Sequence, residues 1–193
     1  MLGLKLPTDP RWANIAEKKI EEILTDHAWC EQKAASSAIS MTIHYPEKSE
    51  LVEAMLELAQ EELEHFQMVH KRILERGLVL GKPRRDEYVR QLLEFFPKDG
   101  AREDKLVHEL LISAMIEARS CERFRVLSEN MEDKELAAFY HELMISEANH
   151  YTLFLKFARQ YGGREKADAK WNALLDFEAE IMSNLGNEEK IHG

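Results

Sequence analysis

The chain has 193 residues, of which 45% are hydrophobic and 32% charged, and its formal net charge is −10 at pH 7. These values are typical of a globular protein with a sizeable core, and the negative charge argues against a protein that coats nucleic acid nonspecifically. No apolar run approaches the roughly 18 residues needed to span a bilayer, and the N-terminus lacks the pattern of a signal peptide. We therefore expect a cytoplasmic protein with no membrane partner, whose two cysteines stay as thiols.

Scarce glycine and proline, together with the helical spacing of apolar residues, predict long helices joined by short connections. Asp9 and Pro10 are suited to start the first helix, and Gly77 is suited to end the second. A crossover segment follows, in which a linker over 78–85 leads to a short amphipathic helix that ends at Pro97. The expected helices cover about 9–41, 46–76, the short segment before Pro97, 102–131, 133–161 and 164–185, and residues 186–193 are expected to form the frayed tail of a single domain over 1–193.

Each of the four long helices carries one glutamate in the middle of its apolar stripe. In the second and fourth of these helices the glutamate opens a Glu-x-x-His motif. The two motifs follow the preceding stripe glutamate at nearly equal distances, 62 − 31 = 31 and 147 − 117 = 30 residues, which indicates a repeated helix pair. In a four-helix bundle, this pattern is the ligand set of a dinuclear iron or manganese site. We therefore predict an all-α four-helix bundle with the ligands Glu31, Glu62, His65, Glu117, Glu147 and His150.

Four buried carboxylates would cost more than the net stability of one domain unless they are protonated, paired with basic groups or bound to metal. Carboxylates and imidazoles suit first-row metals, and i, i+3 spacing directs both side chains of a motif to one point. One Glu-x-x-His motif is expected by chance in a chain rich in glutamate. Two motifs on core stripes, each about thirty residues after a stripe glutamate, are not.

Two neighbouring residues allow more than one interpretation. His27 lies one turn before Glu31 on the same stripe, and is either a group beside the metal or substrate or a hydrogen-bonded core histidine. Glu122 lies about 140° around the helix from Glu117, and is expected to be a solvated charge or a group behind the ligands.

The sequence in and around these motifs contains several distinctive short segments. It includes the segments HAWCEQKAA (27–35), EELEHF (61–66), SEANHY (146–151), EAR (117–119) and LGK (80–82). Over nearly its whole length the chain resembles the bacterial tRNA 2-methylthio-N6-isopentenyladenosine hydroxylases, a family of the ferritin-like diiron superfamily. The resemblance implies a ferritin-like bundle with a crossover segment and an extra C-terminal helix.

The resemblance also implies an activity, that of a diiron monooxygenase in tRNA modification. The six residues above would bind two iron ions, with manganese as the alternative metal and O2 as co-substrate. A reductase or ferredoxin would donate electrons. The substrate would be the isopentenyl group of a hypermodified adenosine next to the anticodon of prenylated tRNA.

Local basic clusters are candidate contacts for the anticodon loop, because a splayed-out nucleotide needs only a modest phosphate footprint. They are equally consistent with ordinary surface charges, and arginines of the third long helix could pair with acids on their own helix. The candidate RNA-binding residues are Lys82, Arg84, Arg85, Arg119 and Arg123.

Other functions share this ligand set. A ferritin-like iron oxidation or storage protein would oxidise iron itself, although the lack of Cys-x-x-Cys pairs excludes a rubredoxin-like module. A different diiron or dimanganese enzyme would act on a small substrate, such as a lipid-like molecule or peroxide. A metal-free helical interaction module would leave the four core glutamates unexplained.

Overall fold

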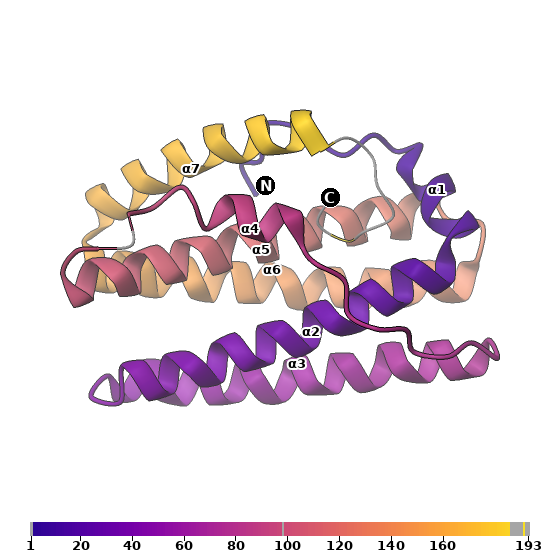
Figure 1. Cartoon of the computed structure of the whole chain (residues 1–193), viewed down its shortest axis with the longest axis horizontal. Coiled ribbons are helices and arrows are strands. Elements are labelled where there is room, and N and C mark those ends of the chain that lie inside the picture. Colours follow the sequence, from indigo (N-terminus) through magenta and orange to yellow (C-terminus); the bar gives the residue numbers. More distant parts are fainter. Residues whose placement is uncertain (1, 98, 186–190, 192–193) are drawn as a thin grey trace. The chain divides into compact units, whose positions relative to one another are not determined.

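The computed structural model describes residues 2–97, 99–185 and 191 (Figure 1). Every regular element in this part of the chain is a helix, and none of these helices combines the length and the apolar run that crossing a bilayer would require. Contacts divide the chain into two compact units, which we call the hairpin unit (Lys18–Arg85) and the large unit (the helices outside this range). The helices are α1 (Trp12–Lys18), α2 (Ile20–His44), α3 (Ser49–Glu75), α4 (Glu87–Leu92), α5 (Arg102–Asn130), α6 (Lys134–Gly162) and α7 (Arg164–Leu185).

The hairpin unit is built from α2 and α3, which lie side by side and antiparallel (Figure 1). Apolar residues at three- and four-residue spacing bury one stripe of each helix, including Leu24 and Leu51. Helix α3 ends just before Gly77, which adopts a φ of 66° and donates its N–H to the Leu74 carbonyl at 2.9 Å. This left-handed position favours glycine, so the predicted helix end at Gly77 is confirmed.

The segment after α3, residues 78–85, turns back and passes over α2 within the hairpin unit (Figure 1), and we call it the strap. The Gly81 N–H donates to Thr25 Oγ1 at 3.3 Å, and the Gly81 carbonyl accepts from Trp29 Nε1 at 2.9 Å. The predicted linker is therefore packed against α2 rather than running freely between helices.

In the large unit α5 and α6 form a second antiparallel hairpin, which α7 contacts, and α4 packs against α7. The start of α6 is fixed by Asp133, whose carboxylate accepts from the N–H groups of Glu135 and Leu136 at 3.0 Å. The end of the same helix approaches α5 closely, because a Cβ added at Gly162 would lie 2.9 Å from Val107 Cγ2. Each hairpin thus carries two of the four stripe glutamates on adjacent helices.

The helix order agrees with the sequence prediction, apart from the first helix. One continuous helix is expected over 9–41, but the backbone leaves the helical region at Lys19 (φ −124°, ψ 36°), so α1 and α2 are separate. The reason is a tertiary contact, because the Glu17 carboxylate accepts from the N–H groups of Glu132 and Asp133 at 2.6 and 3.1 Å. This contact holds α1 in the large unit, whereas α2 starts the hairpin unit.

Most of the tail expected over 186–193 lies outside the described residues, namely 186–190 and 192–193. Ile191 is described: its side chain is buried, and its N–H donates to Asp26 Oδ2 at 2.9 Å. The single domain expected over 1–193 stays a prediction.

Candidate metal centre

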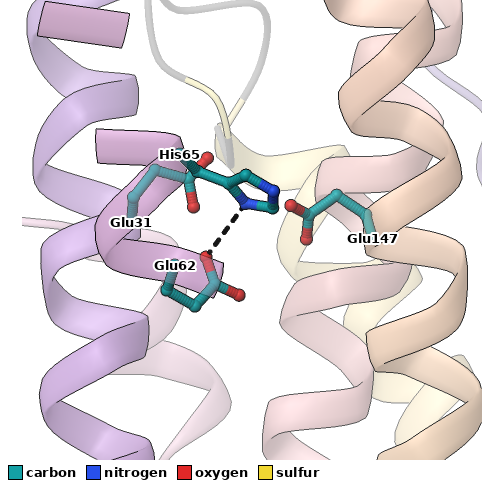
Figure 2. A group of neighbouring side chains, drawn as sticks. All are labelled: Glu31, Glu62, His65 and Glu147. Carbon is teal, nitrogen blue, oxygen red and sulfur yellow. Dashed lines mark ion pairs between the residues drawn. The ribbon is translucent and has the colours of Figure 1, made fainter. Parts of the chain in front are cut away.

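The hairpin unit gathers three buried side chains of the metal-ligand type, Glu31 from α2 and Glu62 and His65 from α3 (Figure 2). Their exposed fractions are 4%, 0% and 6%, and each offers a ligand atom within 4.8 Å of the others. His65 Nδ1 lies 3.5 Å from Glu62 Oε2, which is the ion pair drawn in Figure 2. The i, i+3 spacing places Glu62 and His65 on adjacent turns of α3, and the antiparallel pairing with α2 supplies Glu31.

The large unit repeats this arrangement with Glu117 from α5 and Glu147 and His150 from α6. These side chains are 5%, 2% and 3% exposed, and their ligand atoms also lie within 4.8 Å of one another. His150 Nδ1 lies 4.0 Å from Glu147 Oε2. The two units therefore present the same donor set, two carboxylates and one imidazole, on the same kind of helix pair.

The chemistry of each group follows from its burial. An ionised carboxylate in a protein interior is strongly destabilising unless a cation or a set of donors compensates it. Carboxylate oxygen and imidazole nitrogen are the donors that bind first-row metal ions in proteins. The buried glutamate and histidine groups therefore indicate a metal site.

His27 is fully buried beside the hairpin group. Its Nε2 lies 2.6 Å from Glu31 Oε1, one helical turn away. The sequence leaves open whether His27 is a group beside the metal or a hydrogen-bonded core histidine. The structure shows a hydrogen-bonded core histidine whose partner is Glu31, a carboxylate of the metal-ligand type. With its proton on Nε2, His27 donates to Glu31 and restricts the rotamer of that carboxylate.

Arg119 is predicted from the sequence as an RNA contact, but its side chain is completely buried inside the large unit. The guanidinium donates to Glu178 Oε1 at 2.6 and 2.8 Å and to Glu122 Oε2 at 3.1 Å. Burial is the largest single effect on the pKa of Arg119 and lowers it, but the carboxylates of Glu178 and Glu122 and the Tyr88 hydroxyl together outweigh burial, so the pKa of Arg119 is raised. A guanidinium held in this way cannot reach a phosphate, and this corrects the prediction for Arg119.

Glu122 is likewise buried rather than solvated. Its carboxylate accepts from the Thr8 N–H at 3.0 Å and from Thr8 Oγ1 at 2.5 Å. The Tyr88 hydroxyl donates to Glu178 Oε1 at 3.3 Å, which extends the same network to α4. We call these residues, with Arg119, the buried ion network. The pair of Arg119 with Glu122 is the alternative, an ion pair within one helix, that the sequence leaves open for Arg119. Sequence reasoning missed the other members, because Thr8, Tyr88 and Glu178 lie far from this pair along the chain.

Arg123 is the second predicted RNA contact that the structure corrects. Its side chain is fully buried, and its guanidinium carbon lies 4.1 Å from the centroid of the Trp12 ring. Burial, together with the nearby charge of Arg119, lowers the pKa of Arg123 to about 10. Because it stacks on Trp12 in the interior, Arg123 has no access to a phosphate.

The remaining predicted RNA contacts lie on the strap. Lys82 and Arg85 are exposed, whereas Arg84 is half-buried and pairs with Glu22 at 3.1 Å. Their assignment to RNA binding stays a prediction.

Comparison with known proteins gives matches over nearly the full chain. The family model described as tRNA-(MS2IO6A)-hydroxylase (MiaE) matches residues 2–193. A tRNA 2-(methylsulfanyl)-N(6)-isopentenyladenosine(37) hydroxylase from Pseudomonas putida is 37% identical, over 98% of this chain and 91% of that protein. A protein of the same name from Salmonella typhimurium is 26% identical, over 98% of this chain and 87% of that protein.

A solved structure is similar as well. It is described as protein 43 with aldehyde deformylating oxygenase activity from Synechococcus, and it matches with a TM-score of 0.90 and 33% identity, over 98% of this chain and 95% of that chain. The predicted all-α, ferritin-like fold class is thereby confirmed. With the family model matching residues 2–193, the chain belongs to the tRNA-(MS2IO6A)-hydroxylase family, the family that its sequence motifs resemble.

Proposed function

We propose that this chain is a non-haem diiron monooxygenase that hydroxylates the isopentenyl group of a hypermodified adenosine next to the anticodon of tRNA. One observation supports it above all: a chain of this hydroxylase family carries the donor set of a dinuclear site in two buried groups of identical composition. Family membership argues for the substrate, and the buried groups argue for the metal chemistry.

The metal ligands would be the six residues of the two groups. Four carboxylates bring four negative charges, which two divalent cations would neutralise, and the two imidazoles complete a donor set that suits iron. The repeated helix-pair pattern in the sequence supports treating the two groups as halves of one centre. The proposed ligands are Glu31, Glu62, His65, Glu117, Glu147 and His150.

The net reaction defines what the site must provide. A C–H bond of the isopentenyl group becomes C–OH and the second oxygen atom of O2 leaves as water, while two electrons come from a reductase or ferredoxin and two protons come from solvent. Two bound iron ions would supply the activation of O2, which no side chain can perform alone. The residues of this chain would hold the metals in a site from which bulk water is excluded, since all six ligand residues are at most 6% exposed. A tRNA substrate agrees with the expected cytoplasmic location.

The experiment is reconstitution of the metal-free protein with Fe(II) or Mn(II) without oxygen, followed by O2, reductant and prenylated tRNA. We expect two iron ions per chain and a nucleoside that gains one oxygen atom. Glu62→Gln should lower the bound iron, whereas Glu64→Gln, an exposed position on the same helix, is the matched control and should not. Iron-loaded protein that leaves tRNA unchanged would refute the substrate, and a protein without stoichiometric metal would refute the ligand assignment.

A second candidate function has one specific observation in its favour. The similar solved structure, at 33% identity, is described by an aldehyde deformylating oxygenase activity. The same metal site would then act on an aldehyde instead of a nucleotide. Incubating the reconstituted protein with a long-chain aldehyde and reductant, in parallel with the tRNA assay, separates the two candidates.

A further inference from the structure

We propose that the hairpin unit holds the anticodon loop on a surface made of three aromatic side chains, Trp29, Phe66 and His70, and two strap cations, Lys82 and Arg85. The rings would stack on an unpaired base, and the cations would contact backbone phosphates. This proposal rests on the proposed function, because it names where that function's RNA substrate binds. We call the five residues the stacking surface.

The three rings form a continuous series across α2 and α3. The centroids of Trp29 and Phe66 lie 6.0 Å apart in an edge-to-face arrangement, and those of Phe66 and His70 lie 6.3 Å apart with nearly parallel planes (13°). All three side chains are half-buried, so part of each ring faces solvent. The Trp29 N–H is already used by the Gly81 carbonyl, so its exposed part offers only an aromatic face. Such faces stack on any base, whatever its hydrogen-bonding edge.

The strap is held firmly next to these rings. Besides the Trp29 bond, the Gly81 N–H donates to Thr25 Oγ1, and a Cβ added at Gly81 would lie only 3.1 Å from Thr25 Cγ2. Arg84 closes the other end of the strap by pairing with Glu22 at 3.1 Å. The strap cations therefore start from a fixed backbone beside Trp29, and little further ordering is needed when a ligand binds.

The two remaining strap cations have no internal role in the described part of the chain. Lys82 and Arg85 are exposed and form no ion pair there, in contrast to Arg84 between them. They are three residues apart along the chain, which in an extended backbone spans at most about 11 Å. Both side chains can therefore contact phosphates of the same RNA strand. Two uncompensated cations on a chain with a net charge of −10 mark a local preference for an anionic partner.

The chemistry favours single-stranded RNA over a second copy of this chain. A twofold contact between two copies would bring the same patch, with its two cations, against itself, which like-charge repulsion disfavours. Exposed rings beside phosphate-binding cations are the combination that binds unpaired nucleotides. The stacking surface would not distinguish one base sequence from another, so recognition of the modified base would come from the metal-containing site.

The test measures binding of a fluorescently labelled anticodon stem-loop that carries the prenylated adenosine to the iron-loaded protein, over a range of salt concentrations. Three double variants are compared with the native chain. Trp29→Leu with Phe66→Leu removes the stacking faces, and Lys82→Glu with Arg85→Glu reverses the strap charge. Arg164→Glu with Lys166→Glu makes the same charge change at two exposed positions of α7 and is the matched control.

The aromatic variant should weaken binding about 5- to 150-fold for each base that no longer stacks, with little change in salt dependence. The strap variant should weaken binding and lower the slope of log affinity against log salt by about 0.7 for each phosphate that the protein no longer neutralises. The α7 control should change affinity less than about twofold. Iron content and helical circular dichroism are measured on every variant, and the exposed strap variant keeps the test valid if the aromatic variant is poorly folded.

The proposal would be overturned if the strap variant bound the stem-loop as tightly as the native chain does. It would also be overturned if the strap variant lost no more affinity than the α7 control. An aromatic variant that changes only the oligomeric state on a sizing column would assign the surface to a second copy and would also overturn it. These outcomes are separable from the proposed function, which is judged by hydroxylation of tRNA by the native chain.

Discussion

Replacing Arg119 with methionine should destabilise the large unit strongly, because this residue is the cation of the buried ion network. Its guanidinium contacts Glu178 at 2.6 Å and Glu122 at 3.1 Å, and both Arg119 and Glu178 have side chains that are 0% exposed. Methionine has a similar volume but no charge, so the substitution leaves the buried Glu178 carboxylate without its cation, while Glu122 keeps only the more distant Arg125 at 3.7 Å.

The magnitude follows from the burial. Breaking a buried ion pair by removing one partner costs about 3–5 kcal/mol, and for a chain of this size each kcal/mol lowers the melting temperature by about 2–4 °C. Glu122 keeps the two donors of Thr8, so most of the loss falls on Glu178. We therefore expect a melting temperature about 6–20 °C lower. Arg125→Met is the control, because Arg125 is 47% exposed and its pairs with Glu129 and Glu122 should contribute at most about 1 kcal/mol.

The pH dependence gives an independent check. Burial already raises the pKa of Glu178 above 4.5, and Arg119 opposes that rise, so its removal should raise the pKa further. A carboxyl group with a raised pKa in the folded state stabilises the fold below its unfolded pKa, and this stability is lost as pH rises through the folded value. The difference in free energy of unfolding between the Arg119→Met variant and the native chain should therefore be smaller at pH 5 than at pH 8.

Thermal unfolding followed by circular dichroism measures these differences, and the double variant Arg119→Met with Glu178→Met should regain more than half of the lost stability. A single Arg119→Met variant within about 1 kcal/mol of the native chain would refute the buried ion pair. A destabilisation that grows as pH falls from 8 to 5 would refute the sign of the argument.

The other predictions concern the metal ligands and the thiols. Protein freed of metal by a chelator should melt about 5–11 °C lower than protein kept at a free metal concentration of about 100 times the dissociation constant of the metal. A melting temperature independent of metal would count against the site. His27→Leu should weaken iron retention more than His27→Gln, which keeps an N–H for Glu31, and equal iron-release rates would exclude a positioning role. Burial raises the pKa of Cys121 to about 11, so at pH 8 a thiol reagent should label half-buried Cys30 in the folded protein and Cys121 only after unfolding, whereas rapid labelling of both would contradict the burial.

The helices could be predicted because their signals are local. Apolar residues at three- and four-residue spacing define each stripe, and Gly77 and Asp133 mark helix ends through their own conformational and capping properties. The two groups of ligand-type residues could be located for the same reason, since Glu-x-x-His places both side chains on one helical face.

The contacts that sequence reasoning missed are tertiary. The break at Lys19 depends on Glu17 reaching the start of α6, and Arg119 depends on a partner 59 residues away. Arg119 and Arg123 belong to a helix that is buried on nearly all sides, so the usual expectation that arginines lie at the surface does not apply to them. The apolar residues on more than one face of α5, such as Leu110 and Ile112, were the available signal.

In the function that we propose, a metal pair held by the six glutamate and histidine ligands inserts oxygen into the prenyl group of tRNA. It is tested most directly by a single turnover of the iron-loaded protein with isotopically labelled O2 and prenylated tRNA, with mass analysis of the digested nucleosides. We expect one labelled oxygen atom in the isopentenyl side chain, in an amount set by the number of iron pairs. Unlabelled, unchanged nucleoside from protein that carries its full iron content would contradict it.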